Sequence, residues 1–155
     1  MRAAYHDQHV RNLRPRRVQC DGIWNFCYAK AKNAPEDKIA LGAGDVWTWV
    51  AINADMRLGI SYLVGKRHAQ NASRLMHDLA GRTVNRFQLT TDGHHVYLNA
   101  VEAAFGADID YAMLVKVYGR FHARSLDSLV KARVFGMTQL KEQFQRKAFP
   151  DGGRV

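Results

Sequence analysis

The stretch Val46-Trp-Thr-Trp-Val-Ala-Ile52, the short segment Asn53-Ala-Asp55 and the stretch Leu58-Gly-Ile-Ser-Tyr-Leu-Val64 decide how this chain folds. The two outer stretches are rich in β-branched and aromatic residues, which fit the pleated and half-buried surface of a strand. The segment between them has the composition of a turn. The sequence therefore predicts a β-hairpin over residues 46–64.

A helix follows the hairpin. Ala72, Leu75, Met76 and Leu79 recur at spacings of three and four, which places them on one face of a helix, and Gly81 is the expected stop. Further along, residues 84–90 have strand character, residues 98–105 form a second helical pattern that ends before a glycine, and residues 111–118 are a strongly apolar strand.

The two ends of the chain are predicted as follows. Residues 17–21 are compatible with a strand, and a second apolar stretch covers residues 24–28, before turns at 33–38 and 42–45. Ser125 is positioned to cap a last helix. The apolar residues of that helix are Leu129, Val130, Val134, Met137, Leu140 and Phe144.

The order of these elements defines the fold class. Three strands, a helix, a strand, a helix, a strand and a helix predict an α/β fold with a mixed five-stranded sheet flanked by helices. This is the order of a ribonuclease H-like fold, and a generic α/β domain with the same order is the alternative. The expected division is a basic helix and linker over residues 1–16, the core over 17–119, and a C-terminal helix and loose tail over 120–155.

Length and composition limit the class of protein. The 155 residues are enough for one domain, and they contain no apolar run near the roughly 20 residues that cross a bilayer. The N-terminus lacks the apolar region of a secretory signal, so a cytoplasmic protein without a membrane partner is expected. Cys20 and Cys27 have no second pair, which argues against a disulfide framework and a four-cysteine zinc site, and both are expected to be reduced and buried.

The formal net charge of +9 favours a polyanionic partner, because cationic side chains placed on phosphates release condensed counterions. Nucleic acid is the first candidate, and a charge that only maintains solubility is the alternative. The basic residues that we expect to contact nucleic acid are Arg14, Arg16, Arg17, Lys66 and Arg67.

Two acids are placed for metal chemistry. In the strand order of a ribonuclease H-like fold, the first and fourth strands are neighbours, so Asp21 and Asp92 converge. Adjacent carboxylates repel each other unless a cation neutralises them, and Mg²⁺ or Mn²⁺ prefers oxygen ligands. The alternatives are a turn or N-cap role for Asp92, within Thr-Asp-Gly, and a solvent-facing position for Asp21 at a strand edge.

Several segments of the chain, which occur in the same order, resemble transposases of the insertion-sequence-one type, a family with an Asp, Asp, Glu catalytic triad. The segments are Val18-Gln-Cys-Asp-Gly-Ile-Trp24, Lys32-Asn-Ala-Pro-Glu-Asp-Lys38, Gly44-Asp-Val-Trp-Thr-Trp-Val-Ala-Ile52, Leu63-Val-Gly-Lys-Arg67, Gln88-Leu-Thr-Thr-Asp-Gly-His94 and Ala104-Phe-Gly-Ala-Asp-Ile-Asp-Tyr-Ala-Met-Leu-Val-Lys116. They extend over roughly residues 11–119.

The resemblance implies Mg²⁺-dependent or Mn²⁺-dependent DNA cleavage and strand transfer, with Asp21 and Asp92 as the first two metal-binding acids. It implies transposon ends and target DNA as partners, together with full-length transposase or a second copy of the chain. His94 belongs to the same motif, as a residue that orients a phosphate or hydrogen-bonds to Asp92. Trp24, Trp47 and Trp49 are interpreted mainly as packing residues, with base stacking as the alternative.

The chain departs from the family pattern in three places. Gly22 stands where the family has Glu, and the helical DNA-binding region that precedes the family core is not in the sequence. The third acid, within a Tyr-Val-Glu-Arg-Gln-Asn-like motif, is missing because the resemblance stops after Gly119. Glu142, on the expected last helix, is the candidate replacement, and a solvated surface acid is the alternative, since exposed helical acids are usually solvated. We therefore expect a truncated or frameshifted transposase with impaired catalysis, or alternatively a non-catalytic fragment that binds DNA or inhibits transposase.

Overall fold

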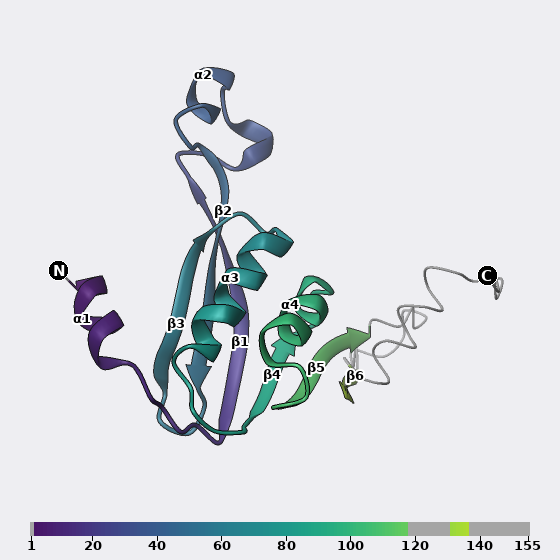
Figure 1. The fold of residues 1–155 in the computed structure, drawn as a ribbon. Helices are drawn as coiled ribbons and strands as arrows, with labels where there is room; N and C mark the ends of the chain where they lie inside the picture. The colour runs from purple at the N-terminus through teal and green to yellow at the C-terminus, as the bar shows by residue number, and fades with distance from the viewer. Residues whose placement is uncertain (1, 118–130, 137–155) are drawn as a thin grey trace.

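The computed structural model of the chain describes residues 2–117 and 131–136. Its elements in chain order are α1 (Arg2–His9), β1 (Arg17–Cys27), η1 (Ala31–Asn33), α2 (Glu36–Ile39), β2 (Gly44–Asn53), β3 (Leu58–Gly65), α3 (Ala69–Ala80), β4 (Gln88–Asp92), α4 (Val96–Phe105), β5 (Asp110–Val117) and β6 (Lys131–Gly136). The strands form one sheet in the order β3-β2-β1-β4-β5-β6 (Figure 1).

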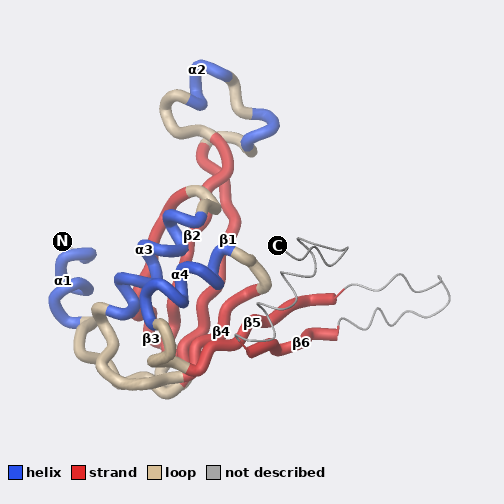
Figure 2. The backbone as a smooth tube through the Cα atoms, turned by 45° about the vertical axis from the view of Figure 1, so that its right-hand side comes forward, coloured by secondary structure: helices blue, strands red, loops and turns tan. Residues whose placement is uncertain are grey.

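The sheet is mixed. β1, β2 and β3 pair antiparallel in succession, whereas β4 pairs parallel with both β1 and β5. The predicted hairpin is β2 and β3, and the predicted neighbourhood of the first and fourth strands is confirmed by the β1–β4 pairing. Helices α3 and α4 pack side by side on one face of the sheet (Figures 1 and 2).

The core lies between these two helices and the sheet. Alternate strand residues such as Val18 and Leu89 are fully buried on the helical face, because successive side chains of a strand point to opposite faces. From α3, the predicted set Ala72, Leu75, Met76 and Leu79 is buried against them, which confirms the apolar face of that helix.

Both helices end at the predicted glycines. α4 ends at Gly106, whose φ of 55° lies in the left-handed region that glycine enters without a Cβ penalty. α3 ends at Gly81, where the φ of −68° is ordinary right-handed geometry, and the Gly81 N–H bonds to the carbonyl of His77. The pattern predicted both ends, but only Gly106 requires glycine for its conformation.

Two predicted strand boundaries are wrong. The stretches 17–21 and 24–28 are parts of one strand, β1, because β2 pairs along its length from Val18 to Cys27. β4 begins at Gln88 rather than at residue 84, since Val84 N–H bonds instead to the carbonyl of Leu13 in the N-terminal linker. The sheet therefore runs continuously through Asp21.

The C-terminal prediction is wrong where the structure describes it. Residues Lys131–Gly136, including Val134 of the expected helix, form strand β6, which pairs antiparallel with β5. Pairing satisfies the backbone groups along the outer edge of β5, and this tertiary gain overrides the helical spacing. The rest of the expected helix, with Glu142, lies outside the described residues.

Strands β1 and β2 continue beyond the rest of the sheet as a two-stranded arm, defined here as residues 23–46. β4 pairs with β1 only as far as Cys20, and β3 pairs with β2 from Trp47 onward, so these arm residues pair with each other alone among the described strands. The arm carries η1 and α2 at its tip and stands away from the body (Figures 1 and 2). Cys27 is exposed on it, which corrects the expectation that both cysteines are buried.

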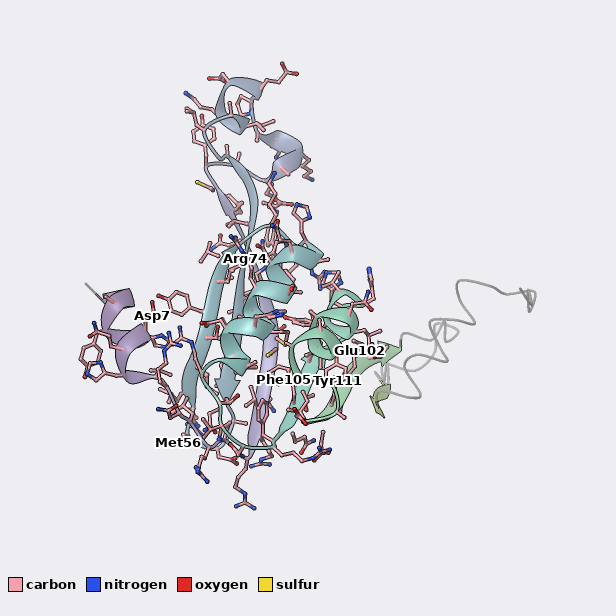
Figure 3. All side chains as sticks on the ribbon, viewed as in Figure 1. Asp7, Met56, Arg74, Glu102, Phe105 and Tyr111 are labelled. Atoms are coloured by element: carbon pink, nitrogen blue, oxygen red, sulfur yellow. The ribbon has the colours of Figure 1, made fainter. Side chains whose placement is uncertain are left out.

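The N-terminal helix α1 is held against the body by Arg82, whose exposed fraction is only 4%. Its guanidinium donates to the carboxylate of Asp78, at 2.7 Å, and to that of Asp7 on α1, which Figure 3 labels. Ser61 of β3 donates to the same Asp78 carboxylate. A charged network thus joins α1, β3 and α3, which fixes the start of the basic linker.

Among the described helices, none combines the length and the apolar character that a bilayer crossing requires.

Candidate active site

Asp21 and Asp92 line one cleft of about 770 Å³. They come from adjacent parallel strands, and each lies one residue beyond the last registered pair, Cys20 with Thr91. Parallel pairing in that register is what brings two acids 71 positions apart in sequence to the same place. The remaining residues that line the cleft are Gln19, Cys20, Arg67, Thr90, Thr91, Gly93, His94, Leu114 and Val115.

Asp21 lies in the middle of β1 and is exposed. Its Oδ1 accepts a hydrogen bond of 2.7 Å from the N–H of Gly22, and because each carboxylate oxygen has two lone pairs, both oxygens keep a site for a ligand. Acids are depleted inside strands, because the position favours side chains that pack on the pleated surface. An exposed acid at a strand's centre, facing a cleft, is therefore a better ligand candidate than an edge acid.

Asp92 ends β4 and is held from two sides. Its Oδ2 accepts a hydrogen bond from Arg67 Nη2 at 3.2 Å, which is also an ion pair, and its Oδ1 accepts one from the backbone N–H of His94 at 3.3 Å. The bond from the His94 N–H to the Asp92 side chain, two residues back, is typical of an aspartate in a turn, which was the alternative prediction for Asp92. The turn thus orients the carboxylate, and this role does not compete with a ligand role.

Arg67 is fixed by stacking as well as by charge. Its Cζ lies 4.5 Å from the ring centroid of Trp47, a cation–π contact, while its guanidinium reaches Asp92. Arg67 was predicted to bind nucleic acid, and the structure places it within the cleft. A guanidinium there balances one carboxylate and presents further N–H donors, which suit a phosphate.

His94 contacts Asp92 through its backbone rather than through its ring. The imidazole stacks on the indole of Trp49, with ring centroids 6.2 Å apart. Burial lowers the pKa of His94, and the nearby positive charge of Arg67 lowers it further. A neutral ring at the cleft wall follows, so the phosphate-binding role predicted for His94 would act through N–H donation and not through charge.

The floor of the cleft is buried and neutral. Cys20 also lines the cleft, and burial raises the pKa of its thiol, an effect that the charges of Asp92 and Asp21 increase. Thr91 and Tyr111 share a hydrogen bond of 2.8 Å in the same layer. Burial likewise raises the pKa of Tyr111. Cys20 and Tyr111 therefore keep their protons and add no negative charge beneath the carboxylates.

The donor set fits a hard divalent cation. Two carboxylates, with the side chains of Gln19 and Thr90 beside them, present oxygen atoms to one open cleft, and Mg²⁺ binds through one or two carboxylates while it retains several waters. Within the described part of the chain, no group of three or more His, Cys, Asp or Glu side chains is arranged around a common point. Glu142, the predicted third acid, is not among the described residues.

The predicted nucleic-acid contacts separate into two groups. Lys66 and Arg67 follow β3 and lie at the cleft end of the sheet, where Lys66 is exposed. Arg16 and Arg17 lie at the opposite end, beside Asp55, with which Arg17 forms an ion pair. Asp21 is four positions after Arg17 on β1, which is about 13 Å along a strand.

Arg14 precedes Arg16 in the linker that leads into β1 and is exposed as well. The linker arginines are thus available to a long polyanion rather than to a small ligand in the cleft.

The sequence interpretation missed the role of Trp47. Trp49 is a core residue, 1% exposed, as expected, but Trp47 is half-buried and supports the Arg67 guanidinium. The hairpin itself carries the signal: its register sets Trp47 opposite Gly65, two residues before Arg67. A register counted from the Asn53 turn would instead pair Trp47 with Val64, because a bulge between Ala51 and Ile52 shifts the pairing by one residue.

Comparison of the chain with models of known protein families gives no match, and the search of curated proteins gives none either.

Proposed function

We propose that the chain performs transposase-type phosphodiester chemistry on DNA with divalent metal ions, in the manner of the insertion-sequence-one transposases that it resembles. The observation that carries this proposal is the convergence of Asp21 and Asp92 in one cleft, on neighbouring parallel strands. The strand order β3-β2-β1-β4-β5, with β2 antiparallel, supports the finer assignment of the fold as ribonuclease H-like.

Asp21 and Asp92 would hold Mg²⁺ or Mn²⁺ through their carboxylate oxygens. When bound, the cations would activate the attacking oxygen and neutralise the leaving oxygen of a phosphodiester. Arg67 would donate to the non-bridging oxygens of the phosphate, because its planar guanidinium is already held by Trp47. The exposed Lys66 after β3 and the exposed arginines at the start of β1, Arg14, Arg16 and Arg17, would contact the flanking DNA backbone.

A non-catalytic DNA-binding or transposase-inhibiting role is the second candidate, and the Arg67–Asp92 ion pair favours it. The Arg67 guanidinium already neutralises the Asp92 carboxylate, so that carboxylate attracts a metal cation less strongly. In this case the cleft would bind phosphate through Arg67 and Lys66 without cleaving it.

Calorimetric titration with Mn²⁺ separates the candidates. The catalytic proposal expects binding by the wild type and at least tenfold weaker binding by Asp21→Asn and by Asp92→Asn. Asp108→Asn, an exposed acid beside α4 and outside the cleft, is the matched control and should bind like the wild type.

A wild type that binds no Mn²⁺ at millimolar concentration would refute the catalytic proposal. A strand-cleavage assay on DNA that carries transposon ends, with Mg²⁺ and with EDTA, then completes the test. DNA binding that persists in EDTA, with no cleavage in Mg²⁺, identifies the non-catalytic role.

A further inference from the structure

Aromatic rings form a row along one face of the arm. Trp24 and Trp47 are directly opposite each other in the β1–β2 register, so their side chains share a face, and Phe26 lies two residues further along the same face. The rings of Trp24 and Phe26 are 5.9 Å apart. An added Cβ on Gly22 would lie 3.4 Å from the Trp47 ring, which places that glycine on this face too.

The row begins at the cleft. Trp49 is two residues from Trp47 on the same strand face, and its ring stacks on His94, which lines the cleft. Trp49 is 1% exposed, whereas Trp24 is 40% and Phe26 43% exposed. The same strand face therefore changes from core to open surface as it passes beyond the two helices, and the side chains of Trp24 and Phe26 are partly open to solvent.

Cations accompany the rings. The Arg67 guanidinium lies over Trp47, and the Nζ of Lys30 lies 5.2 Å from the ring centroid of Trp24. Asp45, which pairs with Phe26 in the register, accepts a hydrogen bond of 3.0 Å from the N–H of Ala31, so its carboxylate already has a donor. Alternating rings and cations are the elements that hold unpaired nucleotides, with bases on the rings and phosphates on the cations.

We propose that the aromatic row, which runs from Trp47 at the base of the arm to Trp24 and Phe26 on the arm, binds unpaired nucleotides of DNA that lead into the Asp21–Asp92 cleft, together with Lys30. The proposal deepens the function proposed above and rests on it for the identity of the nucleic acid. Charge decides between DNA and a protein occupant: Lys30 lies over Trp24 on the arm and Arg67 lies over Trp47 at the cleft end of the row, and these two cations suit a polyanion. A strand that is unpaired beside the cut would thereby be held in position.

Fluorescence anisotropy tests this with two labelled substrates, a blunt duplex and the same duplex with a single-stranded tail, in metal-free buffer. The wild type should bind the tailed duplex more tightly. Trp24→Ala and Phe26→Ala should each weaken tailed binding by about 5- to 150-fold, the loss of one base–aromatic stack, and leave blunt binding unchanged. Lys30→Gln should lower the slope of log affinity against log salt by about 0.7 for the tailed substrate.

Two further variants serve as controls. Trp24→Phe keeps an aromatic face and should retain most of the tail preference. Leu41→Ala removes an apolar side chain that is 78% exposed on the same arm but outside the row, and it should bind both substrates like the wild type. Because these side chains are exposed, circular dichroism should show wild-type folding for all of them.

Equal affinity of the wild type for the two substrates would overturn the inference, as would a Trp24→Ala variant that behaves like Leu41→Ala. Sedimentation of the wild type and of Trp24→Ala tests whether the row binds a second copy of the chain instead. If Trp24→Ala loses self-association but binds the tailed duplex as the wild type does, the inference is also overturned. Mn²⁺ binding that depends on Asp92, combined with no tail preference, refutes this inference alone. Tail preference without Mn²⁺ binding supports it and refutes the catalytic function.

Discussion

Removal of Arg67 should tighten the binding of a divalent cation. In the structure the Arg67 guanidinium donates to Asp92 Oδ2 at 3.2 Å, so a cation on that carboxylate would lie about 5 Å from a positive charge. A +2 ion and a +1 group at that separation repel by about 1.7 kcal/mol in water, or about 17-fold in affinity. Since Arg67 is 38% exposed and can turn away, we expect a gain of about 5- to 15-fold for Arg67→Ala.

The assay is Mn²⁺ titration followed by calorimetry at low salt, where charge effects are least screened. Arg67→Lys keeps the charge and should change the affinity by less than Arg67→Ala. Arg74→Ala removes an exposed arginine from α3, outside the cleft, and should leave the affinity at its wild-type value (Figure 3). An Arg67→Ala variant with unchanged or weaker Mn²⁺ binding would show that Arg67 does not oppose the cation, and the reasoning would be refuted.

Two predictions concern the network that holds α1. Arg82→Ala should lower the free energy of unfolding by about 1.5–3 kcal/mol in urea denaturation, because it removes charged hydrogen bonds to Asp78 and Asp7; an unchanged midpoint would contradict this. Burial would raise the pKa of Asp78, but the hydrogen bonds from Arg82 and Ser61 outweigh it and leave that pKa lowered. The contribution of the Asp78 carboxylate is therefore complete above its unfolded pKa of 3.8 and lost as the pH falls through the lower folded value. Asp78→Asn should be less stable than the wild type from pH 5 to 7, with the difference shrinking below pH 3.8, and a difference that grows in acid would contradict the assignment.

Local sequence patterns were sufficient for the elements of the core. The hairpin of β2 and β3, the apolar face of α3 and the stop of α4 at Gly106 depend on residues within a few positions of one another. Patterns failed where distant partners compete for the backbone. β6 forms where helical spacing predicted a helix, because the edge of β5 offers hydrogen bonds that a local pattern does not register.

In the candidate site, too, one feature could be predicted from the sequence and another depends on contacts between distant residues. That Asp21 and Asp92 are neighbours followed from the assumed strand order, and the β1–β4 pairing agrees with it. The engagement of Asp92 by Arg67 did not follow, since it depends on a guanidinium that crosses from the end of β3 and is held there by Trp47.

The sequence by itself determined the α/β class, the two acids at strand positions and the excess of basic charge, because spacing and composition are properties of the chain alone. Only the tertiary structure decided that Trp24 is exposed while Trp49 is buried, although both lie in strand patterns rich in aromatic residues. The physical reason is that burial depends on what covers a strand face, and α3 and α4 cover the sheet but not the arm.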